Sequence, residues 1–70
     1  MPRPEPREAI EVEYKNRRYS GTFTTSIGMV HVISLLGRKS AQLTSASPAS
    51  VAISLLIEII READQDGMLS

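Results

Sequence analysis

Basic side chains in two short polar segments are the residues of this 70-residue chain best suited to binding chemistry. Guanidinium and ammonium groups that lie together bind phosphate oxygens. The first segment follows residues 10–14 and the second follows residues 29–36, so antiparallel strands would bring both to one end of a sheet. These candidate anion-binding residues are Lys15, Arg17, Arg18, Arg38 and Lys39.

The whole-chain charge argues against a nucleic-acid binder, because eight acidic residues cancel the eight Lys and Arg residues. The pattern also places no exposed aromatic residue beside the basic group for base stacking. Lys and Arg are common in exposed turns. Our first interpretation is therefore that these five residues are ordinary solvent-exposed turn residues. Nucleic-acid or polyanion binding through this basic pole is the alternative.

Residues for catalysis or metal binding are scarce in the sequence. His31 is the only histidine and cysteine is absent, which argues against a metal site built from one chain. No serine lies in a Gly-x-Ser-x-Gly elbow. We therefore expect no enzyme activity, no catalytic residue, no metal and no cofactor. His31 is expected to be a spectator or to pack at an interface.

Hydrophobic periodicity predicts an antiparallel meander of three strands. Residues 10–14 and 19–25 alternate between apolar and polar types, and a third strand spans residues 29–36. Gly37 ends that strand, and a short fourth strand over residues 41–44 is left open.

One face of this sheet collects the apolar side chains if Tyr14 lies opposite Tyr19 and Phe23 opposite Val32. Gly21 and Ser34 leave a shallow place on that face, where a helix can approach closely. The predicted core face comprises Ile10, Val12, Tyr14, Tyr19, Phe23, Val30, Val32 and Leu36.

A helix over residues 48–64 completes the predicted α+β fold, with the order β-β-β-α. Ser47 is a favourable N-cap, Pro48 suits the first helical position, and Gly67 suits the helix stop. The apolar sector of this helix is wider than a single sheet contact requires. One flank is expected to pack on the sheet and the other to face a second surface.

Surplus apolar surface on a short chain without disulfides predicts a homodimer. The candidate surfaces are the spare flank of the helix and the outer face of the third strand, which lies at an edge unless a fourth strand covers it. The candidate interface residues are Ile53, Ile57, Ile60, Met29, His31, Ile33 and Leu35. We expect a homodimeric, non-enzymatic interaction module with an unidentified protein partner.

Domain boundaries follow from the composition of the two ends. Prolines at positions 2, 4 and 6 predict a disordered lead-in over residues 1–8, followed by one domain over residues 9–66 and a frayed tail over residues 67–70. No apolar run is long enough to span a membrane, and no export signal is visible. A cytoplasmic location is the expectation.

Short motifs at the turns and core positions resemble those of small uncharacterised bacterial proteins. They are Tyr19-x-Gly21, then Gly28-Met29-Val30-x-Val32-x-Ser34, and Gly37-x-Lys39-Ser40. The resemblance covers residues 10–63 and implies a fold without implying an activity. A fainter resemblance to double-stranded-RNA-binding domains is confined to residues 37–42 and carries no RNA-contacting position over.

Overall fold

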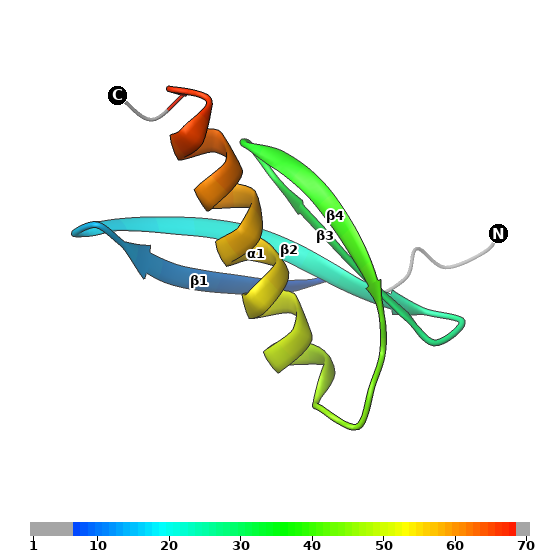
Figure 1. Ribbon diagram of the computed structural model, residues 1–70. Coiled ribbons are helices and arrows are strands. Elements are labelled where there is room, and N and C mark those ends of the chain that lie inside the picture. Colours follow the sequence, from blue (N-terminus) through cyan, green and yellow to red (C-terminus); the bar gives the residue numbers. More distant parts are fainter. Residues whose placement is uncertain (1–6, 69–70) are drawn as a thin grey trace, which may run out of the picture.

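A four-stranded antiparallel sheet with one helix across one face forms the fold (Figure 1). The computed structural model describes residues 7–68. The strands are neighbours in chain order, and the predicted α+β meander with a C-terminal helix is confirmed. The elements are β1 (Glu8–Tyr14), β2 (Arg17–Ser26), β3 (Met29–Ser34), β4 (Gly37–Gln42) and α1 (Pro48–Gln65).

The fourth strand is longer and earlier than the segment that the sequence left open. β3 ends at Ser34, two residues before the predicted end, and Leu35 and Leu36 form the turn into β4. The Ser34 hydroxyl closes this turn by donating to the Gly37 carbonyl at 3.1 Å and accepting from the Leu36 amide at 3.2 Å. Gly37 therefore begins a strand instead of ending one, and β4 covers the edge of β3.

The first hairpin differs in register from the prediction. Tyr14 lies opposite Arg17 and Val12 opposite Tyr19, two residues away from the expected Tyr14–Tyr19 pair. The cause is a two-residue turn in which Lys15 and Asn16 have φ values of 49° and 66°, as type I′ turns require. A shift of two residues keeps every side chain on its predicted face.

The core lies between the sheet and α1, and the predicted core face is confirmed. Phe23, Val30 and Val32 are buried there, and the other five predicted residues pack around them half-buried. A Cβ atom on Gly21 would lie 3.3 Å from Leu56 Cδ1, so the helix does approach closely at the predicted shallow place. The helix contributes Ala52, Leu55, Leu56, Ile59 and Ile60 to this core.

Both ends of α1 carry the predicted capping residues. The Ser47 hydroxyl accepts from the Ser50 amide at 3.2 Å, and Pro48 is the first helical residue. At the other end Gly67 has a φ of 76°, and the amides of Gly67 and Met68 donate to the carbonyls of Asp64 and Ala63. This is the Schellman arrangement.

The structure differs from the predicted domain boundaries at both ends of the described residues. Glu8 already belongs to β1, although the sequence placed it in the lead-in. Gly67 and Met68 are bonded to the last helical turn, so they are not frayed. The rest of the predicted lead-in, except Arg7, and the rest of the tail lie outside the described residues.

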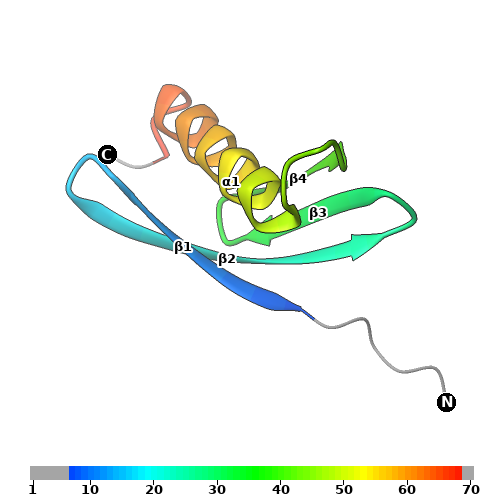
Figure 2. The ribbon, with the colours of Figure 1, turned by 90° about the horizontal axis from the view of Figure 1, so that it is seen from below.

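The sheet divides into two arms near the end of the helix. β2 pairs with β3 only between the pairs Thr22–Ile33 and Ser26–Met29. The β1–β2 and β3–β4 pairings, in contrast, both continue up to their turns. Figures 1 and 2 show the end of α1 lying between the tips of the two hairpins. This arrangement brings the acidic end of the helix to the basic turns.

Candidate interaction surfaces

The five predicted anion-binding residues all lie near the arms of the sheet, beside the C-terminal end of α1. Lys15 is in the first turn, Arg17 and Arg18 begin β2, and Arg38 and Lys39 follow the first residue of β4. The C-terminal end of a helix carries the negative end of its dipole. The helix thus opposes an anion at this end of the molecule.

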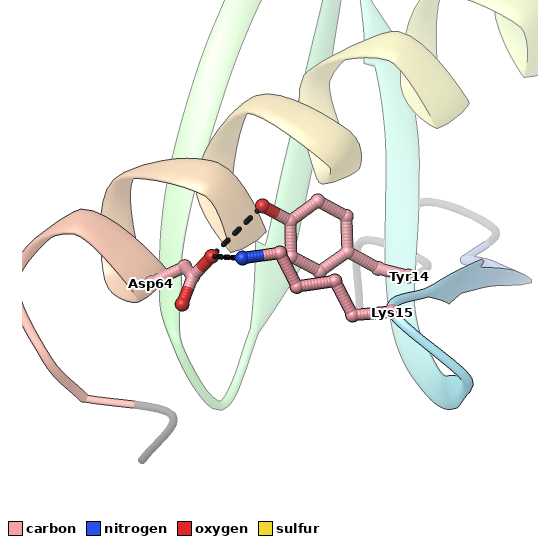
Figure 3. Close-up of polar contacts among 3 residues, drawn as sticks. All are labelled: Tyr14, Lys15 and Asp64. Atoms are coloured by element: carbon pink, nitrogen blue, oxygen red, sulfur yellow. Dashed lines mark hydrogen bonds and ion pairs between the residues drawn. The ribbon is translucent and has the colours of Figure 1, made fainter.

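Lys15 is neutralised by a carboxylate of α1 (Figure 3). Its Nζ donates to Asp64 Oδ2 at 2.7 Å, and the Tyr14 hydroxyl donates to the same oxygen at 3.0 Å. These hydrogen bonds, that from Lys15 first, lower the pKa of Asp64. The hydrogen bond to Asp64 raises the pKa of Lys15, and it also raises the pKa of Tyr14.

Lys39 and Arg18 also have carboxylate partners. Lys39 Nζ lies 2.9 Å from Glu62 Oε1, and this hydrogen bond raises the pKa of Lys39. Arg18 Nη1 lies 3.5 Å from Glu11 Oε1, in an exposed pair that contributes little to stability. Three of the five predicted residues are thus paired with acids.

The two other predicted residues do not form one patch. Within residues 7–68, neither Arg17 nor Arg38 has a carboxylate within 4.0 Å. Arg17 shares a face of β2 with Tyr19, on the helix-covered side, whereas Arg38 lies opposite Ile33, on the helix-free side. The structure therefore gathers the basic residues at one end but divides the unpaired ones between two faces.

The predicted interface residues of the third strand lie on the helix-free side. Met29 and His31 are half-buried, Ile33 is 46% exposed, and Leu35 is fully exposed in the turn after β3. A shallow hollow of about 380 Å³ runs between Ile33, Leu35 and β2, lined also by Ala9 and Thr22. Ile33, Leu35 and the hollow beside them form an apolar surface, which we call the Ile33–Leu35 patch.

The predicted interface residues of the helix are divided between surface and core. Ile53 is 38% exposed and Ile57 is half-buried, but Ile60 is fully buried in the core of its own chain. Strands of both arms of the sheet, β1 in one and β3 and β4 in the other, contact α1. Ile60 is therefore a core residue and not part of a surface.

The open edge of β4 is a feature that the sequence reasoning missed. Residues 38–40 were expected in a loop, yet Ser40 lies opposite His31, and its Oγ is 2.7 Å from His31 Nδ1. A groove of about 380 Å³ beside this strand is lined mostly by small or apolar residues, among them Ala41 and Val51, and also by the carboxylate residue Glu58. The sequence carries no clear signal for this strand, because the two central residues of the turn, Leu35 and Leu36, are not the Asn, Asp or Gly residues typical of two-residue hairpin turns.

Metal-ligating clusters and membrane-spanning helices are not found among the described residues. Among residues 7–68, no three His, Cys, Asp or Glu side chains are grouped so that they could hold a metal ion. None of the described helical structure is long and apolar enough to cross a membrane. Comparison of the chain with protein-family models, curated proteins and solved structures found no match.

Proposed function

We propose that this protein is a homodimeric, non-enzymatic interaction module that binds a partner protein through the Ile33–Leu35 patch. The observation that carries the proposal is the full exposure of Leu35 beside the 46%-exposed Ile33. Exposed apolar side chains contribute little to folding, whereas burial against a partner contributes about 1.5–3 kcal/mol for each one. In the isolated chain these two side chains leave apolar surface exposed to water, and a bound partner protein would bury it.

The partner that suits this patch is apolar at its centre and acidic at its rim. Arg38 of β4 lies opposite Ile33 of β3, and it has no acidic partner in the described residues. Arg18 lines a second hollow together with Leu35, and a carboxylate of the partner would replace Glu11 in its exposed 3.5 Å pair. Guanidinium groups at the rim of an apolar patch favour carboxylates on the partner and fix its orientation.

The homodimer and a cytoplasmic location belong to the same proposal. A chain of 70 residues has a small core, and it lacks the cysteines that stabilise many small domains. Self-association supplies the missing buried surface. The absence of cysteine also fits a reducing compartment.

Polyanion binding has less support as a second function. Lys15, Lys39 and Arg18 each have a carboxylate within 3.5 Å, and these acids compete with phosphate for the same donors. A phosphate-driven contact would also weaken steeply with added salt. Binding to generic DNA or RNA at low salt, lost at moderate salt, would revive this alternative.

The test measures mass and partner capture with the same variants. Light scattering of the wild-type protein is expected to give twice the chain mass of 7.7 kDa. Immobilised wild-type protein should retain a defined protein from lysate of its own organism, and Leu35→Asp should lose it. Ser45→Asp, which adds the same charge at an exposed position of the loop before α1, outside both hollows beside Leu35, should keep it. Equal capture by the wild-type and Leu35→Asp proteins would contradict the proposed patch.

A further inference from the structure

We propose that the open edge of β4 is the seam of the homodimer. Two copies join antiparallel through β4, about a two-fold axis at Ser40, so that the two sheets become one continuous sheet. This inference rests on the proposed homodimer and identifies its seam. It leaves the Ile33–Leu35 patch of both copies free on the helix-free face.

The backbone of β4 has one unpaired side in the described part of the chain, because β3 is its only neighbour there. Across the two-residue turn, Gly37 and Ser34 form a hydrogen-bonded pair, so alternate residues Lys39 and Ala41 also bond to β3. The Leu43 amide continues this phase by donating to the Gly28 carbonyl at 2.7 Å. The amides and carbonyls of Arg38, Ser40 and Gln42 therefore point to the open edge.

One register pairs all three of these residues with a second copy. Centred on Ser40, it places Ser40 opposite its own copy and Arg38 opposite Gln42. A register centred on Arg38 would instead oppose two guanidinium groups, which is destabilising. β4 is basic in its first half and uncharged in its second, so this antiparallel register keeps the basic residues of the two copies from lying opposite each other.

The charges on the helix-covered face fit the same register. Lys39 of the second copy lies opposite Ala41, which lines the groove between β4 and α1. Glu58 lines that groove as well. The second copy thus brings the Lys39 ammonium group, which pairs with Glu62 of its own chain at 2.9 Å, towards a further carboxylate. The small side chains of Ser50 and Ser54 in the groove leave room for this approach.

The other edge of the sheet is poorly suited to a two-fold seam. By the same alternation, Ala9, Glu11 and Glu13 of β1 direct their backbone groups outwards. Pairing two β1 strands about Glu11 would place two carboxylates opposite each other. Pairing β1 with β4 of another copy matches charges, but such a contact repeats from copy to copy and gives rings or filaments.

A proline scan of the two edges tests the seam. Ser40→Pro removes an outward amide of β4 and keeps the backbone bonds to β3, but it loses the side-chain contact with His31. Glu11→Pro is the matched change on β1, and it loses the side-chain contact with Arg18. Sedimentation equilibrium should show at least a tenfold weaker dimer for Ser40→Pro and wild-type dimerisation for Glu11→Pro. Circular dichroism checks that each variant keeps its fold.

A cysteine reporter provides a second measurement that does not depend on the proline. The chain has no cysteine, so Ser40→Cys introduces a single thiol at the proposed axis. Opposed residues of a hydrogen-bonded pair lie about 5.5 Å apart between Cα atoms, within the range that a disulfide spans. Mild oxidation should link most Ser40→Cys chains into dimers, whereas Ser20→Cys should stay unlinked.

The outcomes separate this inference from the proposed function. A wild-type protein that stays monomeric at high concentration overturns both the dimer and its seam. A wild-type dimer that survives Ser40→Pro, or that leaves Ser40→Cys unlinked, overturns the seam alone. Loss of association in both proline variants, with larger species in the wild type, would indicate β1–β4 pairing and contradict the two-fold seam.

Discussion

The two faces of the sheet differ sharply although they are built from the same strands. Val32 is fully buried under α1, whereas its neighbour Ile33 is 46% exposed on the other side. Both residues are β-branched, apolar and suited to a strand. The difference shows that β3 carries apolar residues on both faces, and that α1 buries only one of these faces.

The helix-covered face is closely packed, and the helix-free face is open. Leu56 of α1 is fully buried above Gly21, whereas Leu35 in the turn after β3 is fully exposed. Stability is therefore expected to depend on the first face and binding on the second. The following experiments test this division.

The largest effect is expected from truncating a leucine of the helix-covered face, and truncation of an exposed leucine outside that face is the control. Leu56→Ala should lower the free energy of unfolding by about 2–5 kcal/mol, because it leaves a cavity between helix and sheet. Leu35→Ala removes the same atoms from an exposed turn and should change it by less than about 0.5 kcal/mol. Urea denaturation measures both values. Similar losses would show that the two faces are not divided in this way.

A smaller loss is expected from adding one methyl group to the helix-covered face. A Cβ atom on residue 21 would lie 3.0 Å from the Ile33 carbonyl oxygen and 3.3 Å from Leu56 Cδ1. Gly21→Ala should therefore cost about 1–3 kcal/mol through overpacking. Ser20→Ala, on the opposite face of the same strand, is the control and should be nearly neutral. A more stable Gly21→Ala protein would mean that helix and sheet can move apart freely.

A gain in stability is expected at the β2–β3 turn, outside the packed core. Ile27 is fully exposed and has a φ of 51°, a conformation unfavourable for a β-branched residue. Ile27→Asn should raise the free energy of unfolding by about 1 kcal/mol, because Asn tolerates this conformation. Thermal unfolding measures the change, and Ile27→Val, which stays β-branched, should show no gain. A lower melting temperature for Ile27→Asn would indicate that the Ile27 side chain is buried by another molecule.

The smallest effect concerns the partly exposed polar contact of Asp64 with Tyr14 and Lys15. Because folding lowers the pKa of Asp64, its contribution is complete above the pKa of the unfolded chain. This contribution is lost as the pH falls through the lower, folded pKa. Asp64→Asn should therefore make stability depend less on pH in the acid range, by a small amount that added salt reduces further. Chemical denaturation at neutral and acid pH measures it.

A matched variant isolates the contribution of this contact. Asp66→Asn removes an exposed carboxylate that has no ion pair among the described residues. It should keep the acid dependence of the wild-type protein. If both variants behave alike, the Asp64 contact contributes nothing measurable.

The sequence by itself determined the element order, the core face and the helix ends. Alternation with a period of two assigned all eight core-face residues correctly, and it did so even where the first hairpin register was wrong. A shift of two residues preserves the face, so the pattern cannot detect it. Ser47, Pro48 and Gly67 marked the ends of α1 because capping is a local property of the backbone.

Only the tertiary structure decided which strands and side chains contact each other. The small, polar residues of β4 carry too weak an alternation to predict a strand, and pairing with β3 orders them. The basic residues met the acidic end of α1 because the meander returns the helix to that end. Ile60 is fully buried in the core, although the width of the apolar sector of the helix had placed it on a surface. Contacts of this kind depend on the three-dimensional path of the chain, which local patterns of residue type do not contain.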